Sequence, residues 1–278
     1  MHAPHRPPLP GGENEVLRDS RVADSLLPPP FPPTMPKSTF PAQEAADILD
    51  DVLTVLEHET HKEPFTLPRQ IVWFGGAPGS GKGTNSATMM RVLGITAPPI
   101  VCSDLLDTPE MKAIKDAGQL VGDKDVARLL LKTLLEPQYR HGVLVDGFPR
   151  SPIQGEMVRQ LWSRSRELHR RRPERFDKAD FMIVVLTVGE KESVDRQLKR
   201  GRESLAKAEA LRAAGQPAPE IRATDIDEGK VRKRYQTFMD VTYNVLTSLK
   251  DAFPSHVIDG TGDIPTVEKL IVETLGRR

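Results

Sequence analysis

The stretch GAPGSGKGT, residues 76–84, lies between the apolar run IVWF, residues 71–74, and the helix-compatible segment TNSATMMRVL, residues 84–93. Glycine-rich spacing between a strand and a helix is the context that a phosphate-binding loop requires. Glycines let the backbone wrap closely around phosphate oxygens, so that successive N–H groups point inward, and the helix that begins near Lys82 adds its positive dipole end. This stretch therefore predicts a site for nucleotide phosphates and an α/β fold around it.

Two side chains of this loop predict its chemistry. Lys82 would reach the β- and γ-phosphates of ATP, and the Thr84 hydroxyl would ligate Mg²⁺. The general pattern has Ser or Thr directly after the lysine, whereas Gly83 stands there and the hydroxyl comes one residue later. We predict ATP and Mg²⁺ as cofactors. The alternative for this loop is a glycine-rich turn that binds no ligand.

Short apolar strands alternate with helical patterns from Arg69 onward, which indicates βαβ units and a parallel sheet covered on both faces. The predicted strands are residues 70–74, 100–102, 142–146, 180–188 and 256–259. The predicted helices are residues 109–117, 123–135, 152–168, 190–200, 225–251 and 265–275. We therefore predict a three-layer α/β/α fold with a five-stranded parallel sheet, formed by residues 69–278 as one domain.

The residues before this domain divide into two parts. Residues 1–41 hold 11 of the 25 prolines, so we predict a disordered or polyproline-like tail, either without function or serving as a docking peptide for a partner. Residues 42–68 form an amphipathic helix and a linker. The apolar positions of the helix recur at helical spacing: Ala45, Ile48, Leu49, Val52, Val55 and Leu56. This helix either packs on the following domain or makes a dimer contact.

Composition excludes several classes of protein. Lys+Arg and Asp+Glu each number 39, and this balance argues against a nucleic-acid partner. No apolar run reaches the roughly 18 residues that would span a membrane. Cys102 is the single cysteine, which excludes an intramolecular disulfide and a cysteine-based zinc site. The first residues carry Glu13, Glu15 and Asp19 and lack the apolar core of a signal peptide, so we expect a cytoplasmic protein.

Five blocks, in order, resemble the adenylate kinase family of nucleoside monophosphate kinases. GAPGSGKGT is similar to that family's phosphate loop, and DGFPRS, residues 146–151, is similar to its DGFPRT segment. Residues 115–121 are similar to the segment that closes that family's monophosphate-binding region. Residues 194–200 and 222–234 resemble the helices that lead into and out of its mobile lid. The likeness covers residues 70–275.

The resemblance implies a role for each matched residue. The residues that would hold ATP are Gly76, Gly79, Ser80, Gly81, Lys82, Gly83, Thr84, Asn85 and Arg196. Those that would bind the acceptor are Asp104, Val121, Gly147, Arg150 and Gln154. The catalytic set would be Lys82, Arg150, Arg196, Arg200, Arg222 and Arg234, with the last four converging on the transferring phosphoryl group. Thr84 and Asp146 would position Mg²⁺.

Each of these residues also has a structural interpretation. Taken alone, each arginine is typical of a solvated surface, as we expect for Lys199, Arg232 and Lys233. Ser151 and Gln154 have the spacing of a helix capping box, so Gln154 is either a cap or a contact to the base. Asp146 could be purely structural.

The acceptor flap, at about residues 103–122, departs from the family. Cys102, Ser103 and Asp107 stand where the family has Thr, Gly and the Arg that contacts the acceptor phosphate. A carboxylate in that place would repel a monophosphate. We therefore expect Arg150 to hold the acceptor with less help, unless Lys112 or Lys115 supplies the charge or the acceptor is not AMP. The segment between residues 107 and 119 is also shorter than usual.

The lid, at about residues 201–222, is predicted to contain a short helix from Ser204 that ends at Gly215, before Pro217. The resemblance thus implies Mg²⁺-ATP-dependent transfer to a nucleoside monophosphate, with ATP and AMP giving two ADP. The partners would be nucleotides, with a protein partner or second copy on the N-terminal extension. The alternatives are a kinase of the same fold with another acceptor, and an ATP-binding regulatory or scaffold protein with weak catalysis.

Overall fold

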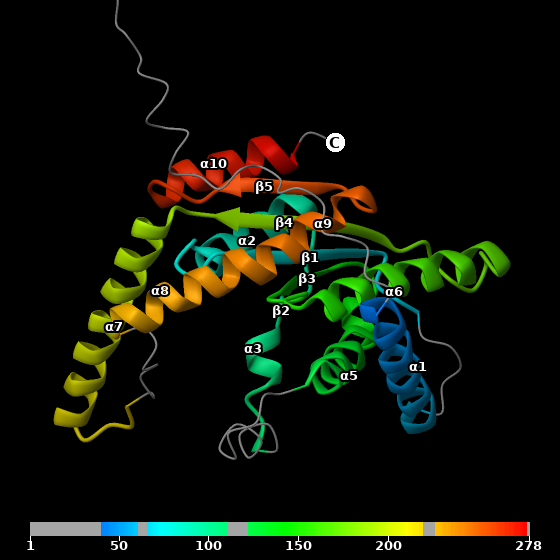
Figure 1. The fold of residues 1–278 in the computed structure, drawn as a ribbon, viewed down its shortest axis with the longest axis horizontal. Coiled ribbons are helices and arrows are strands. Elements are labelled where there is room, and N and C mark those ends of the chain that lie inside the picture. The colour runs from blue at the N-terminus through cyan, green and yellow to red at the C-terminus, as the bar shows by residue number, and fades with distance from the viewer. Residues whose placement is uncertain (1–39, 61–65, 110–121, 219–225, 277–278) are drawn as a thin grey trace, which may run out of the picture.

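The computed structural model describes residues 40–60, 66–109, 122–218 and 226–276 (Figure 1). Its strands are β1 Gln70–Gly76, β2 Ile100–Val101, β3 Val143–Asp146, β4 Asp180–Thr187 and β5 Ser255–Asp259. They form one five-stranded sheet in the order β2-β3-β1-β4-β5, and all four neighbouring pairs are parallel. The predicted α/β fold with a parallel sheet is confirmed. The central strand, β1, leads directly into the predicted phosphate loop.

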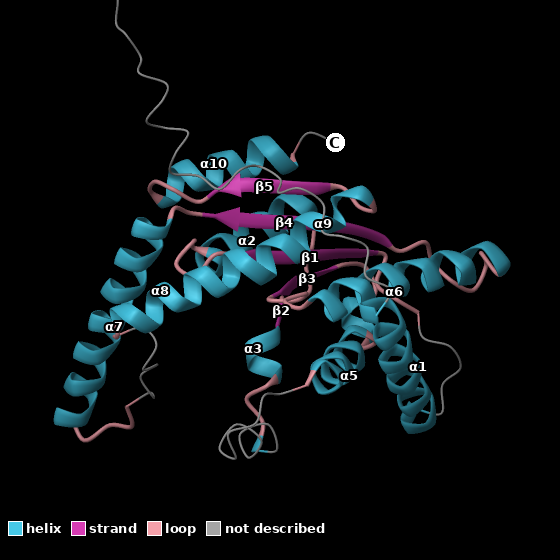
Figure 2. Ribbon diagram, in the orientation of Figure 1, coloured by secondary structure: helices cyan, strands magenta, loops and turns pink. Residues whose placement is uncertain are grey.

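With one exception the helices follow the predicted order (Figure 2): no helix was predicted at residues 102–105, where Cys102 was expected to end a strand. They are α1 Phe40–Thr60, α2 Lys82–Leu93, α3 Cys102–Leu105, α5 Asp123–Leu134, α6 Pro152–Arg171, α7 Glu190–Ala213, α8 Glu228–Thr237, α9 Asn244–Ser248 and α10 Ile264–Leu275. A π-helical segment, Phe238–Tyr243, joins α8 to α9. The predicted helix at residues 109–117 falls almost entirely outside the described residues, as does the tail up to residue 39.

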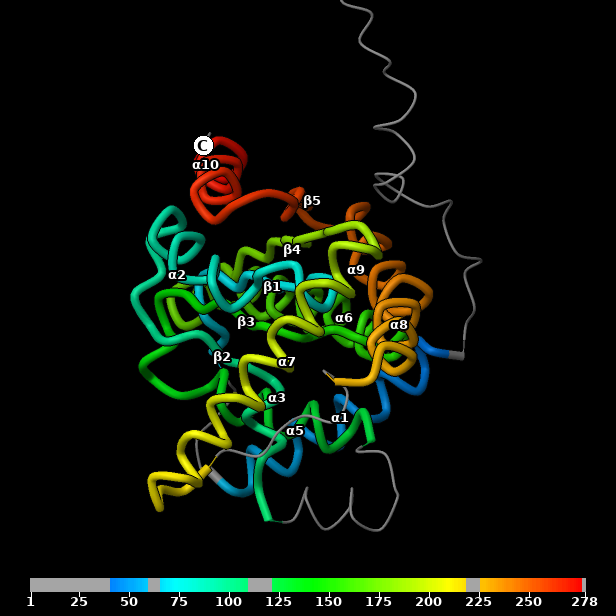
Figure 3. Tube along the Cα trace, turned by 90° about the vertical axis from the view of Figure 1, so that its left-hand side faces the viewer, coloured from blue at the N-terminus to red at the C-terminus, as the bar shows by residue number. Residues whose placement is uncertain are grey.

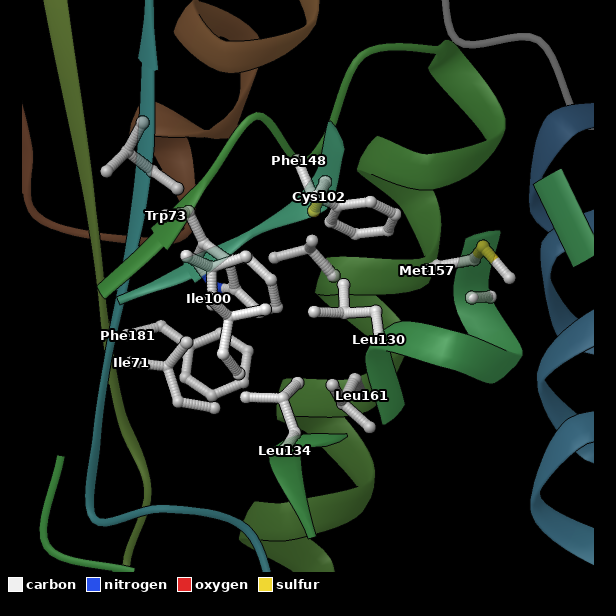
Figure 4. Close-up of a cluster of buried hydrophobic side chains, with 14 of the residues drawn as sticks. Ile71, Trp73, Ile100, Cys102, Leu130, Leu134, Phe148, Met157, Leu161 and Phe181 are labelled. Carbon is white, nitrogen blue, oxygen red and sulfur yellow. The ribbon is translucent and has the colours of Figure 1, made fainter. Parts of the chain in front are cut away.

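Helices cover both faces of the sheet because its buried strands alternate their side chains between two cores. Val72 and Phe74 pack with residues of α2 and α10 on one face. Ile71 and Trp73 pack with residues of α1, α5 and α6 on the other. Figure 3 shows α2 and α10 on one side of the strands and α8 and α9 on the other. In Figure 4 the side chains of Trp73 and Phe181 point from the sheet toward those of α5 and α6.

The N-terminal helix α1 belongs to this core. Ala45, Leu49, Val52, Leu53 and Leu56 are at most 6% exposed and pack in the cluster beneath the sheet. Ion pairs join α1 to α5, through Lys124 with Asp51 and Arg128 with Glu59, and to α6, through Arg164 with Asp50. The apolar face that predicted either domain packing or a dimer contact is therefore covered within the chain.

The helix that leads into the lid differs from the prediction. We expected it to end near residue 200 and a separate helix to start near Ser204, but α7 runs without a break through Gly201. The residues after Gly201 are strong helix formers, which propagate a helix past one unfavourable glycine. The predicted stop is confirmed: Gly215 has a φ of 69°, and Gln216 N–H donates to the Leu211 carbonyl. Figure 1 shows α7 beside α8 at the end of the sheet where β1 and β4 finish.

Among the described residues, none of the helices combines the length and the apolar character needed to cross a lipid bilayer.

Candidate active site

The predicted phosphate loop turns from β1 into α2 over residues 77–81. Gly79 and Gly81 have φ values of 75° and 86°, in the left-handed region that favours glycine. A Cβ on Gly79 would lie 2.9 Å from the Ser193 carbonyl oxygen of α7. Glycine is therefore required at position 79 both by its backbone conformation and by the close approach of α7. The loop ends at the N-terminus of α2, where unpaired backbone N–H groups favour an anion.

Lys82 folds back over this loop. Its Nζ donates to the Gly76 carbonyl at 2.7 Å, from the last residue of β1. Burial lowers the pKa of Lys82 to about 8, Asp146 opposes that shift, and Arg150, Arg234 and Arg200 add to it. Three of the predicted arginines, Arg150, Arg200 and Arg234, therefore lie close enough to lower the pKa of the Lys82 ammonium group.

Two buried polar atoms of the loop region have no partner among the described residues: Ser80 Oγ and Asn85 Oδ1. Ser80 is 1% exposed, so water does not readily satisfy its hydroxyl. Asn85 Nδ2 donates to the Gly81 carbonyl at 2.9 Å, which holds the end of the loop against α2. An unpartnered hydroxyl near the N-terminus of α2 can donate to a phosphate oxygen.

The first turns of α7 pack against the phosphate loop and hydrogen-bond to it. The sequence did not predict this contact. Ser193 is fully buried, and its Oγ donates to the Pro78 carbonyl at 2.6 Å. Gln197, one turn further on, donates to Ser193. The sequence shows only that Ser193 and Gln197 lie four residues apart; their burial, which requires hydrogen-bond partners inside the protein, comes from the structure.

Arg196 lies between α7 and the loop after β5. Its Nη1 and Nη2 donate to the carbonyls of Gly260 and Gly262 at 2.9 and 3.0 Å, and its Nε pairs with Glu192. It lines a cavity of about 730 Å³, together with Thr84, Arg200 and Ile264. The structure therefore does not bring Arg196 beside Lys82, where the predicted convergence on the phosphoryl group would place it.

A second cavity, of about 430 Å³, lies between the phosphate loop and α8. It is lined by Lys82 from α2, Arg150 from the loop after β3, and Arg234 from α8. Lys230 and Lys233 of α8 line it as well. Lys233 is exposed, as expected of a solvated lysine, and it also lines this cavity.

Arg150 is held by its own loop. Its Nε donates to the Gly147 carbonyl at 2.7 Å, and Thr242 of the π-helical segment donates to its carbonyl. Gly147 has a φ of 90°, and a Cβ there would collide with the Arg150 guanidinium. Gly147 thus permits the folded-back position of Arg150 at the mouth of the cavity.

Asp146 and Thr84, the predicted Mg²⁺ residues, lie at the end of β3 and in the first turn of α2, and Thr84 is exposed and lines the cavity of about 730 Å³. Asp146 ends β3 beside β1, and burial raises its pKa while Lys82 and Arg150 oppose that shift. No group of three or more His, Cys, Asp or Glu residues gathers into a metal site within the described ranges. Mg²⁺ commonly binds one or two protein oxygens and completes its shell with substrate phosphates and water, so this donor set suits it.

Gln154 lies at the start of α6, where both ends of its amide are engaged. Its Nε2 donates to Asp123 Oδ1 of α5 at 2.7 Å, and its Oε1 accepts from the Arg150 backbone N–H at 2.8 Å. Ser151 Oγ accepts from the Gln154 backbone N–H and donates to Asp123. In this arrangement Gln154 links α5 to α6. Contact with a base would require its amide to exchange partners.

The acceptor flap is described only in part. Asp104 is exposed on α3, where its carboxylate accepts from Ser103 Oγ at 3.2 Å. Val121, Arg222, Lys112 and Lys115 lie outside the described residues, so their predicted roles stay predictions.

The Asp123 carboxylate accepts the hydrogen bonds that join α5 to the start of α6. Its removal is expected to destabilise the fold. We expect Asp123→Ala to lower the free energy of unfolding by about 1–3 kcal/mol, because the Gln154 amide and the Ser151 hydroxyl lose a charged partner. Urea unfolding measures this. Asp125→Ala is the matched control, since Asp125 lies in the same first turn of α5. Equal effects of the two substitutions would contradict a specific role for Asp123.

Cys102 is expected to be unreactive in the folded protein. It is 3% exposed, and burial raises its pKa to about 12. At pH 8 about one thiol in 10⁴ would then be ionised, so a disulfide reagent should react on the order of a thousandfold more slowly than with the unfolded chain. Colorimetric titration with and without urea checks this; comparable rates would contradict the buried placement.

Comparison with known proteins identifies the family. The family described as AAA domain matches residues 75–212. The adenylate kinase of Beijerinckia indica subsp. indica is 30% identical over 210 residues, covering 72% of this chain and 96% of that protein. The adenylate kinase of Fusobacterium nucleatum subsp. nucleatum is 29% identical over 216 residues, with the same coverage of 72% and 96%. The structure of a gluconokinase from Sinorhizobium meliloti 1021 is similar with a TM-score of 0.38 and 16% identity, covering 76% of this chain and 94% of that one. On the strength of the sequence relatives and the loop geometry, this chain is a P-loop kinase that belongs to the adenylate kinase family.

Proposed function

We propose that the protein transfers the γ-phosphoryl group of ATP to a nucleoside monophosphate, with AMP as the first candidate. The observation that carries this proposal is the convergence of Lys82, Arg150 and Arg234 on one cavity beside the phosphate loop. These three cations come from α2, the loop after β3 and α8. Phosphoryl transfer needs little covalent chemistry from a protein, but it needs positioning and positive charge around a crowded anionic centre.

Each part of the site would act on a different part of the reaction. The loop N–H groups and Ser80 would hold phosphate oxygens, and Lys82 would leave the Gly76 carbonyl for the β- and γ-phosphates. Arg234 would neutralise the charge that develops during transfer, and Arg150 would hold the acceptor phosphate. Mg²⁺ would supply further positive charge between the phosphates, held by Thr84 and Asp146.

The nucleoside of ATP would occupy the cavity of about 730 Å³ on the other side of the loop. The Arg196 guanidinium is fixed there by two loop carbonyls, and Ile264 and Pro265 give the same cavity an apolar wall. A planar cation facing an apolar surface is suited to hold a base by stacking. This placement supports a role for Arg196 in ATP binding and not in the transfer itself.

A second candidate is transfer to another nucleotide or small acceptor by the same machinery. Asp107 favours it, because a carboxylate stands where the resemblance would have an acceptor-binding arginine. The regulatory or scaffold alternative would not need Arg150 and Arg234 beside Lys82. In that alternative, α1 could not serve as a docking surface through its apolar face, because α5 and α6 cover that face.

Product analysis of the purified full-length chain tests the proposal. The protein is incubated with ATP and Mg²⁺ and, in separate reactions, with AMP, GMP, CMP, UMP or dTMP. We expect ADP formation with AMP in excess of an acceptor-free control. Transfer to a different base alone would select the second candidate. Absence of transfer to every acceptor, with ATP binding intact, would refute monophosphate kinase activity.

A further inference from the structure

One face of α8 lines the cavity of about 430 Å³, called here the transfer cavity, with more cationic side chains than Arg234, the one residue of this helix to which the resemblance gives a role. Lys230, Lys233, Arg234 and Thr237 line the cavity. Their spacing of three and four residues places them on one side of the helix. Arg232, between them in sequence, instead pairs with Glu228 and with Glu190 of α7. The helix therefore directs two lysines and one arginine toward the phosphate loop.

The charge lining this cavity is strongly one-sided. Five cationic side chains line it: Lys82, Arg150, Lys230, Lys233 and Arg234. No Asp or Glu of the described residues is part of its lining. Lys230 has a partial partner, since Asp227 lies 3.9 Å from its Nζ. The Lys233 ammonium has no ion pair within the described part of the chain, and its side chain is exposed to the cavity mouth.

ATP itself brings the negative charge of three phosphates to the site, which Mg²⁺, Lys82 and Arg234 would offset. An uncharged acceptor, such as a sugar or a nucleoside, brings no second anion into the cavity. An acceptor that already carries a phosphate brings up to two further negative charges, and like charges repel unless cations separate them. The two lysines that α8 adds to the lining therefore match the added charge of a phosphorylated acceptor.

We propose that Lys233, assisted by Lys230, binds the phosphate that the acceptor already carries, and that this pair supplies the positive charge that Asp107 does not. The inference rests on the proposed kinase function and assigns two residues of α8 to the phosphate of the proposed acceptor. Arg150 holds the same phosphate from the loop after β3, so the acceptor phosphate lies between that loop and α8. Lys82 and Arg234 remain for the transferring group.

Steady-state kinetics of Lys233→Gln test this role with the full-length chain. We expect the KM for the monophosphate to rise roughly tenfold, the size typical of one lost charge-assisted hydrogen bond. The KM for ATP and kcat should change less than twofold. Lys233→Arg keeps the charge and should restore most of the affinity. Lys269→Gln is the matched control, because Lys269 pairs with Glu273 on α10 and lines neither cavity.

Calorimetric titration of AMP, GMP and inorganic pyrophosphate, without ATP, examines the same lysine independently of turnover. Weaker binding of a monophosphate by Lys233→Gln than by the wild type and Lys269→Gln supports the proposal. Equal binding by all three proteins, or no binding of any monophosphate by the wild type, overturns it. Circular dichroism melting confirms that each variant is folded.

The two proposals fail in different ways. A wild type that binds a monophosphate but transfers nothing to it contradicts the proposed function and leaves the binding role of Lys233 standing. A wild type that transfers normally, with an unchanged acceptor KM in Lys233→Gln, contradicts the role of Lys233 alone. An equal rise in the KM for ATP and for the acceptor also contradicts it, since the lysine would then serve both nucleotides.

Discussion

Replacement of Lys82 by alanine is expected to reduce phosphoryl transfer by about a thousandfold or more. Removing one preorganised donor from a charged transition state typically costs two to three orders of magnitude in kcat, and Lys82 is both the most enclosed cation of the cavity and part of the loop that holds ATP. Its Nζ donates to the carbonyls of Gly76 and Ala77, so Lys82 is held on the phosphate loop itself, whereas Arg150 and Arg234 line the cavity from other elements.

The same substitution should leave the fold intact. Burial lowers the pKa of Lys82 from 10.5 to about 8, so the charged form is less favourable in the folded than in the unfolded chain. Below pH 8 the protonated lysine therefore destabilises the native state, and this penalty is relieved as the pH rises from 8 toward 10.5. We expect Lys82→Ala to melt within a few degrees of the wild type at pH 7. The control is Lys269→Ala, and transfer by Lys82→Ala within tenfold of that control would contradict the assignment.

Deletion of the N-terminal helix is expected to abolish stable folding. Without residues 1–60 the chain loses four large side chains from the main core: Leu49, Val52, Leu53 and Leu56, each at most 6% exposed. Burial of one such side chain contributes about 1.5–3 kcal/mol. Their sum, on the order of 6–12 kcal/mol, is comparable to the whole free energy of unfolding of a typical domain.

The matched control for this deletion is a chain that begins at Phe40. It keeps α1 and every contact described above, so we expect it to unfold in urea at the same midpoint as the full-length protein. Leu49→Ala should have an intermediate effect, lowering the free energy of unfolding by about 2–5 kcal/mol. A soluble chain without residues 1–60 that unfolds as the full-length protein does would show that α1 is not part of the core.

Most of the fold could be predicted because its signals are local. Each strand is a short apolar run, and α5 and α10 were predicted within one residue of their observed ends. The phosphate loop was recognisable because its glycines and its flanking strand and helix are adjacent in sequence. The stop of α7 at Gly215 depended likewise on a local glycine. The error at Gly201 arose because one glycine inside a run of helix formers does not decide whether a helix continues.

The arrangement of the site was less predictable, because it depends on contacts between distant residues. Lys233 and Arg232 are neighbours in sequence, yet one faces the transfer cavity and the other pairs with α7. Asp123 receives hydrogen bonds from residues 28 and 31 positions away. The division of Arg196 and Arg234 between two cavities depends on where the loop after β5 passes. None of these placements follows from helical spacing alone.

Transfer of a phosphoryl group from ATP to AMP is the reaction that we propose for this chain. Incubation of the full-length protein with ATP labelled at the γ-phosphate, AMP and Mg²⁺ tests it most directly, with Lys82→Ala alongside. We predict that the label appears in the β-position of ADP with the wild type and that Lys82→Ala forms almost none. Label released only as inorganic phosphate, or labelled ADP formed equally by both proteins, would contradict the account.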